Sequence, residues 1–197
     1  SGDLVNLQEL QAKKCPGLKA LPNTAVAWGA LRELDLRAAG RMFGLPFTIF
    51  RPHNVYGPRQ NIADKFRNAV GIFMNQVLRG EPLSIFGDGQ QTRSFCYVSD
   101  LVDGLIRLMN SGDDVTGPVN LGNPGEFTMR QLAEAVLELT GSKSEIVNRP
   151  LPSDDPRQRQ PDIAKAKSVL DWEPTISLVE GLKPTIEYFR NEIAEMV

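Results

Sequence analysis

Apolar residues along the chain recur at two spacings, one typical of helices and one typical of strands. Leu31, Leu34, Ala38 and Met42 fall on one face of a helix predicted over residues 25–43, with Gly44 after its end. The same spacing predicts further helices at 3–14, 66–79, 101–109, 128–140, 162–171 and 178–195. Extended segments are predicted at 46–51, 83–86, 93–98 and 119–121, with another short one beginning at Ile146. Short strands alternating with helices indicate an α/β architecture.

Turn and cap residues divide these elements. Gly80 closes the helix at 66–79, and Gly87-Asp88-Gly89 forms a turn between the strands at 83–86 and 93–98. Ser99 or Asp100 is expected to cap the helix that follows, and Thr128 to cap the next one. The stretch at 150–161 is rich in proline and charge, so no core element is expected there.

The number of strands suited to a central sheet is small. Only those at 46–51 and 118–121 have the apolar character of buried parallel strands. Two strands alone would leave long unpaired edges and little buried surface. The pattern therefore indicates part of a larger sheet.

Composition excludes several classes of protein. The 197 residues are 41% hydrophobic and 23% charged, with a net charge of −2, so nucleic acid and anionic membranes are not indicated as partners. No apolar run approaches the roughly 20 residues that span a bilayer. The single histidine and the two distant cysteines nearly exclude a His-based zinc site, a Ser-His-Asp triad and a disulfide framework, so no metal site is assigned. We expect a cytoplasmic protein with reduced thiols.

Motifs in a fixed order resemble those of the NAD-dependent sugar-nucleotide epimerases, dehydratases and decarboxylases, which are extended short-chain dehydrogenases/reductases. They are Asn54-Val55-Tyr56-Gly57-Pro58 after a strand, Gly87-Asp88-Gly89-Gln90-Gln91-Thr92-Arg93 in a nucleotide loop, Tyr97-Val98-Ser99-Asp100 at a helix start, and Val119-Asn120-Leu121-Gly122-Asn123 in the last sheet strand. Residues 154–162 and Gly181-Leu182 resemble UDP-glucuronate decarboxylases, whereas residues 66–76 are closer to UDP-glucose 4-epimerase-like members. The resemblance extends over roughly residues 31–190 and is to the C-terminal half of the family.

This resemblance implies an incomplete Rossmann-like parallel sheet with a small α/β substrate-binding lobe interleaved in residues 25–197. Residues 1–24 form a leader that does not match. In the family, NAD lies against a Gly-rich turn at a helix N-terminus, and no G-x-x-G-x-x-G occurs in this sequence. We therefore expect this chain alone not to bind NAD.

A second family feature is a Tyr-x-x-x-Lys pair on the helix before the strand at 46–51. The tyrosine acts as acid and base toward the sugar, and the lysine lowers its pKa. Aligned through Glu33-Leu34-Asp35-Leu36 and Gly44-Leu45-Pro46, the two positions hold Ala25 and Gly29, neither of which can transfer a proton. No catalytic residue is assigned, and we expect the chain alone to be inactive.

The resemblance also implies which residues bind the UDP-sugar. These are Asn54, Leu83, Ser84, Phe86, Arg93 and Arg159, with His53 placing its backbone beside the nicotinamide of NAD. In this assignment Arg93 and Arg159 contact the phosphates, and the strand at 83–86 holds the uracil through its backbone.

Each assignment has a structural alternative. Arg93 is then a surface residue of a hairpin, Arg159 part of a solvated loop, Asn54 an Asx-turn residue and Leu83 plain core. A lone histidine such as His53 is more often structural than catalytic, and Asp154 and Asp155 are interpreted as solvated loop charges rather than a catalytic pair.

Three functions remain open on the sequence alone. The chain is part of an NAD-dependent UDP-sugar epimerase or decarboxylase, a non-catalytic module that binds a UDP-sugar, or an interaction protein. In the last case it forms a homo-oligomer or associates with an intact relative.

Overall fold

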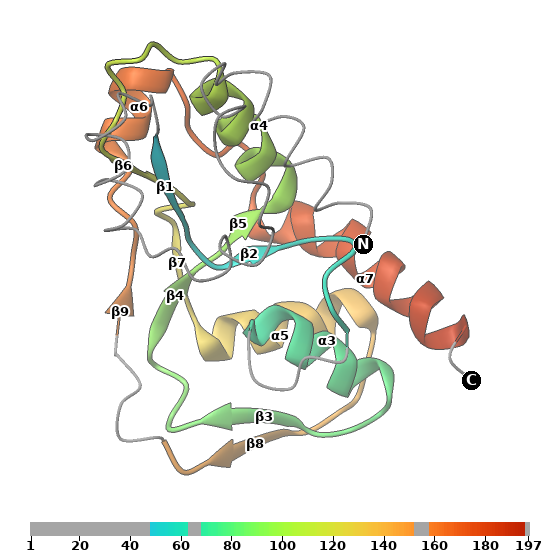
Figure 1. Cartoon of the computed structure of the whole chain (residues 1–197). Helices are drawn as coiled ribbons and strands as arrows, with labels where there is room; N and C mark the ends of the chain where they lie inside the picture. Colours follow the sequence, from blue (N-terminus) through green and yellow to red (C-terminus); the bar gives the residue numbers. More distant parts are fainter. Residues whose placement is uncertain (1–47, 63–67, 152–157, 196–197) are drawn as a thin grey trace, which may run out of the picture. The chain divides into compact units, whose positions relative to one another are not determined.

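The computed structural model describes residues 48–62, 68–151 and 158–195 (Figure 1). The predicted helices at 3–14 and 25–43, the start of the strand at 46–51, and Ala25 and Gly29 lie outside these ranges. The chain divides into two compact units, residues 1–49 with 112–117 and residues 50–111 with 118–197. Apart from Ile49 at the start of the first strand, the elements below belong to the second unit.

The α/β architecture predicted from the sequence is confirmed, with strands gathered into several small sheets. Strand β1 (Ile49–Pro52) pairs with β6 (Pro118–Leu121), the two segments expected in a central sheet. Strand β2 (Val55–Tyr56) runs parallel to β5 (Cys96–Tyr97), and β3 (Leu83–Phe86) runs parallel to β8 (Ile146–Arg149). The fourth sheet has three strands, β7 (Glu126–Thr128), β4 (Thr92–Ser94) and β9 (Gln158–Arg159), with β4 in the middle.

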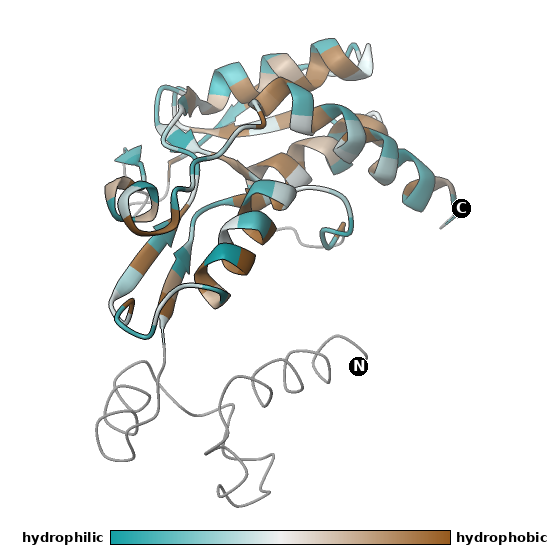
Figure 2. Cartoon of the chain, turned by 90° about the horizontal axis from the view of Figure 1, so that it is seen from above, coloured by the Kyte–Doolittle hydropathy of each residue, from teal (hydrophilic) through white to brown (hydrophobic). Residues whose placement is uncertain are grey.

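The main core lies between β3 and three helices: α3 (Ala69–Leu78), α5 (Met129–Thr140) and α7 (Leu178–Glu195). The inward face of each element supplies apolar side chains, among them Phe73, Leu83, Leu132 and Phe189, which are at most 3% exposed. Figure 2 shows both hydrophobic and hydrophilic residues along these helices, as expected when one face is packed and the other meets water.

A second group of contacts packs α4 (Val98–Met109) against β6 and the segment after α6 (Ala164–Leu170). A side chain at Gly104 would come within 3.0 Å of both Leu121 and Trp172, so the absence of one lets helix and strand approach closely. The Asp100 carboxylate, 5% exposed, accepts hydrogen bonds from Thr175 Oγ1 (3.1 Å) and Ile176 N (3.0 Å). The Asp100 carbonyl accepts one from Trp172 Nε1 at 3.0 Å, so this residue ties α4 to the segment before α7.

Two cap predictions have different outcomes. Thr128 caps α5 as expected, and it forms a full capping box in which the Gln131 side chain accepts from the Thr128 backbone. The prediction that Ser99 or Asp100 caps the preceding helix is wrong, because α4 begins at Val98 with Tyr97 at the cap and no side-chain bond there. The Asp100 carboxylate instead accepts from the distant segment described above.

The strand predicted at 93–98 is also different in the structure. It is broken at Phe95 into β4 and β5, which pair in separate sheets, and Val98 is already helical. Strands β3 and β4, on either side of the Gly87–Gly89 turn, do not pair with each other, so the hairpin interpretation of Arg93 is wrong. Strand β9 was not anticipated, although both its residues are exposed and add nothing to the core.

Candidate functional site

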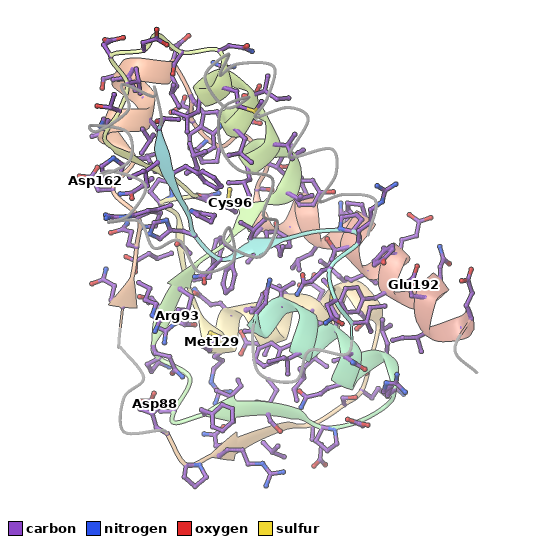
Figure 3. The ribbon with its side chains drawn as sticks, viewed as in Figure 1. Asp88, Arg93, Cys96, Met129, Asp162 and Glu192 are labelled. Atoms are coloured by element: carbon purple, nitrogen blue, oxygen red, sulfur yellow. The ribbon has the colours of Figure 1, made fainter. Side chains whose placement is uncertain are left out.

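Two arginines predicted from distant parts of the sequence lie opposite each other. Arg93 is the middle residue of β4, and Arg159 is its Cα partner in the parallel strand β9. On the other side of β4 the antiparallel partner of Arg93 is Phe127. Paired residues present their side chains on the same face of a sheet, so Arg93 and Arg159 share a face. Figure 3 shows Arg93 on β4, with Met129 at the start of α5 nearby.

Hydrogen bonds fix the backbone on which these arginines stand. Ser94 Oγ donates to the Arg159 carbonyl at 3.3 Å, and Arg93 Nη1 donates to the neighbouring Thr92 carbonyl at 2.7 Å. Ser94 is buried, whereas Arg93 is half-buried and Arg159 is exposed. The two arginines are therefore carried by an ordered backbone, Arg93 partly and Arg159 more fully exposed to solvent.

The opposite face of the same sheet carries a carboxylate, Glu126 of β7. It accepts hydrogen bonds from Thr92 Oγ1 (2.6 Å) and from Gln158 Nε2 (2.8 Å). These three residues come from the three strands β7, β4 and β9 and link them side by side. Sequence reasoning did not single out Glu126, because nothing in its own neighbourhood indicates these partners.

Asn54 joins this region from the loop after β1. Its side-chain Nδ2 donates to the Ser94 carbonyl at 2.9 Å, and its own carbonyl accepts from Cys96 N at 3.1 Å. The backbone at Asn54 has φ +40°, a left-handed conformation that asparagine tolerates better than most residues. Hydrogen bonds thus link Asn54 and the Arg159 backbone through Ser94, the residue of β4 that follows Arg93.

The three predicted residues of β3 are placed differently from one another. Leu83 is fully buried and belongs to the core, Ser84 is half-buried, and Phe86 is 49% exposed. Leu83 N–H and Gly87 N–H both point toward β8, where they donate to Glu145 and Arg149 carbonyls at 2.8 Å. Since the backbone groups of successive residues alternate between the two edges of a strand, those of Ser84 and Phe86 point to the opposite edge.

A short turn connects β3 to the arginine pair. Gly87 and Gly89 have φ of +71° and +79°, conformations that favour glycine, so the chain can turn sharply here. Gln91 Nε2 donates to the Phe86 carbonyl at 2.7 Å, and Met129 N donates to the Gln91 carbonyl at 3.1 Å. The turn is therefore tied both to the β3 edge and to the start of α5.

His53, the residue assigned to the nicotinamide side, lies at the end of β1. Its N–H donates to the Leu121 carbonyl, and its Nδ1 lies 3.1 Å from the Arg51 carbonyl, which as an acceptor requires the proton on Nδ1. A side chain at Gly122 would come within 2.8 Å of His53 Cβ and 2.9 Å of Pro161 Cγ. Within the described ranges His53 is the one residue proposed for NAD, and its ring bonds the local backbone.

Buried titratable groups lie on β2 and β5, away from the arginine face. Burial, followed by the nearby Tyr97, raises the pKa of Tyr56, whose hydroxyl donates to the Leu178 carbonyl at 3.2 Å. Burial also raises the pKa of the Cys96 thiol to about 12, with Asp100 adding to the effect. Both groups are protonated at neutral pH and belong to the packing of α7. Among the residues the structure describes, no cluster of His, Cys, Asp and Glu could hold a metal ion.

Part of this candidate site lies in a region that matches a known protein family. Residues 30–122, which include β3, the turn and β4, match the NAD dependent epimerase/dehydratase family. This stretch of the chain resembles that family. The match ends at Gly122, so Glu126, Gln158 and Arg159 lie beyond it.

Proteins similar in sequence to this chain include two plant decarboxylases. The chain is 56% identical over 150 residues to UDP-glucuronic acid decarboxylase 3 of Arabidopsis thaliana, covering 76% of this chain and 43% of that protein. It is 47% identical over 184 residues to UDP-glucuronic acid decarboxylase 6 of the same plant, covering 86% of this chain and 52% of that protein. The chain therefore spans about half the length of the curated relatives it matches.

Solved structures agree on the fold. The UDP-glucose 4-epimerase of Thermotoga maritima with UDP-glucose superposes with a TM-score of 0.75 at 41% identity, covering 81% of this chain and 51% of that one. The UDP-glucuronic acid 4-epimerase of Bacillus cereus, in complex with UDP-glucuronic acid and NAD, gives 0.74 at 28% identity, covering 81% and 50%. These neighbours confirm the Rossmann-like fold class predicted from the sequence. No helix in the described part of the chain is long and apolar enough to cross a membrane.

Proposed function

We propose that this chain supplies the UDP-binding portion of an NAD-dependent UDP-sugar decarboxylase or epimerase. The observation that carries the proposal is the pairing of Arg93 with Arg159, which gives the sheet formed by β7, β4 and β9 two cationic side chains on one face. The names of the relatives and structural neighbours, which act on or bind UDP-sugars, support the same class of ligand.

A diphosphate suits the arginine pair in charge and in spacing. Neighbouring strands lie about 4.8 Å apart, so two guanidinium groups from paired positions can approach adjacent phosphates. A guanidinium donates two parallel hydrogen bonds to one phosphate, which a lysine cannot do. The Asn54 side chain, hydrogen-bonded to Ser94 beside this pair, completes the phosphate side of the proposed site.

The outer edge of β3 suits a uracil. Among the described residues, Gln76 Oε1 accepts from Ser84 N–H and Gln91 Nε2 donates to the Phe86 carbonyl. The remaining groups on that edge are the Ser84 carbonyl, which accepts, and the Phe86 N–H, which donates. Uracil offers a matching N–H donor next to a carbonyl acceptor, whereas cytosine in the same position offers an acceptor next to a donor. The exposed Phe86 ring adds a flat apolar surface beside the base.

The decarboxylase is the favoured whole enzyme. Its Arabidopsis representative is 56% identical to this chain, compared with 41% for the Thermotoga epimerase structure, and the tail at 154–162 resembles decarboxylases. The corresponding substrate is UDP-glucuronate. The chain itself would bind the nucleotide without turnover, because Ala25 and Gly29 stand where the family has its tyrosine and lysine.

Calorimetry with UDP, CDP and NAD tests the proposal. We expect UDP to bind weakly, CDP more weakly still, and NAD not detectably. Replacing Arg93 with alanine should weaken UDP by about tenfold or more, because a charge-assisted hydrogen bond contributes roughly 1.5–3 kcal/mol. Added salt should weaken binding in the same direction.

Arg190 is a matched control, because it is an exposed arginine whose guanidinium bonds the Thr140 carbonyl. Arg190→Ala should leave the affinity for UDP unchanged. Binding of NAD without UDP, or equal affinity of the Arg93→Ala variant and the parent for UDP, would show that the nucleotide site is assigned wrongly.

A further inference from the structure

Side-chain hydrogen bonds connect the segment that carries Arg159 to β6 and the residues that follow it. Gln158 Nε2 donates to Glu126, Gln160 Nε2 to the Pro124 carbonyl, and Asn120 Nδ2 to the Asp162 carbonyl, each at 2.8 Å. The bonds occur at every second residue of 158–162. We call this segment, residues 158–162, the strap.

The alternation within the strap determines where Arg159 points. Successive side chains of an extended segment point to opposite sides. Gln158 and Gln160 both point toward residues 124–126, so Arg159 between them points away, to the face it shares with Arg93. The direction of the Arg159 guanidinium is thus set by its two neighbours.

The pairing of β9 with β4 is too short to maintain this register alone. Strand β9 has two residues, both exposed, and its two Cα pairs are Thr92–Gln158 and Arg93–Arg159. Short exposed strands are marginally stable in water. Two side chains reinforce the pairing: Ser94 Oγ donates to the Arg159 carbonyl, and Glu126 bridges the two strands, since one of its oxygens accepts from Thr92 and the other from Gln158.

We propose that Glu126 is a positioning residue of the nucleotide site: its carboxylate clamps β9 to β4 so that Arg159 faces the same phosphates as Arg93. The inference rests on the UDP-binding function proposed above. Glu126 lies on the face opposite the arginine pair, so it acts through Gln158 and Arg159 and does not touch the ligand.

This role makes a prediction that runs against simple electrostatics. A carboxylate near a diphosphate repels it, so removal of its charge alone would strengthen UDP binding. Removal of a clamp instead weakens binding, because Arg159 must then be ordered at the moment the ligand binds. Whether UDP affinity rises or falls when Glu126 is replaced therefore distinguishes a repelling charge from a clamp.

The experiment is a double-mutant cycle on the full chain with UDP as ligand. Glu126→Ala should weaken UDP by about three- to tenfold, no more than Arg159→Ala, since a charge-assisted contact is at stake. In the Arg159→Ala background the same change should have less than about a twofold effect, because the two residues act through one contact. Gln158→Ala, which removes the clamp from the other strand, should reproduce the loss.

Two controls separate positioning from general loss of structure. Uridine, followed by NMR at millimolar concentration, should bind Glu126→Ala and the parent equally, because it has no phosphate. Glu134→Ala, which removes an exposed carboxylate from α5, should leave UDP affinity unchanged. Glu126→Gln should restore most of the affinity, because the Gln158 amide can turn to accept from it.

The outcomes are distinguishable. If UDP binds the parent and Arg159→Ala weakens it while Glu126→Ala does not, or if Glu126→Ala and Arg159→Ala are additive, the positioning role is refuted and the proposed function stands. An equal loss of uridine and UDP affinity in Glu126→Ala also refutes the positioning role. Absence of UDP binding by the parent overturns both proposals.

Discussion

Replacing Asp100 with alanine should strongly destabilise the fold. The carboxylate is 5% exposed and accepts from Thr175 Oγ1 and Ile176 N. Each hydrogen bond to a charged acceptor is worth roughly 1.5–3 kcal/mol, and an amide left unpaired costs about 1–3 kcal/mol. The Thr175 hydroxyl can rotate toward another acceptor, whereas the Ile176 N–H is fixed by the backbone. We therefore expect a loss of about 3 kcal/mol in the free energy of unfolding.

Urea denaturation followed by circular dichroism and tryptophan fluorescence measures this loss. With a denaturant slope of about 2 kcal/mol per molar, the midpoint should fall by about 1.5 M. Asp100→Asn keeps one acceptor oxygen and should lose about half as much. Asp103, on the same helix, is exposed and pairs with Arg107 at 2.8 Å, so Asp103→Ala should cost less than about 1 kcal/mol. A midpoint for Asp100→Ala equal to that of Asp103→Ala would refute the tie between α4 and the segment before α7.

Three further predictions concern stability, self-association and activity. Because burial raises the pKa of Cys96 from 9.0 to about 12, the folded state keeps the thiol protonated while the unfolded state ionises. Stability should therefore be full below about pH 9 and be lost progressively toward pH 12, and Cys96→Ala should reduce this alkaline loss in melts at a series of pH values. The chain should self-associate, because Phe50, Val102 and Ile106 are 41%, 46% and 52% exposed; sedimentation showing only a compact monomer would contradict this. Purified chain with added NAD should not convert UDP-glucose or UDP-glucuronate, and turnover free of contaminating enzyme would disprove the assignment of Ala25 and Gly29.

The sequence predicted those features that depend only on residues close together in the chain. Thr128 was predicted to cap α5 and does so, and the glycines at 87 and 89 mark the predicted turn after β3. Strand β3 was predicted with its observed bounds, because alternation of buried and outward residues is visible within four positions.

Features that depend on contacts between residues far apart in the chain could not be predicted from the sequence. Arg93 and Arg159 are separate motifs in the sequence, and only the register of β4 with β9 makes them neighbours. Strands β7 and β9 have three and two residues, too few for a periodic pattern. Asp100 was expected to cap its own helix because short polar side chains usually do, but its partners lie 75 and 76 residues away.

Under the UDP-binding function proposed above, the turn that follows β3 limits the length of ligand that the protein can accept. It sets the distance between the base edge at Ser84 and Phe86 and the cations at Arg93 and Arg159, and it is anchored at both ends, by Gln91 on Phe86 and by Met129 on Gln91. A turn held at both ends keeps the distance between these two groups of residues fixed. A nucleoside with its phosphates at the wrong distance would reach one end of the site only, so selection by length would accompany selection by base. Inserting one more glycine beside Gly89 would change this distance without replacing any of the residues proposed to contact the ligand.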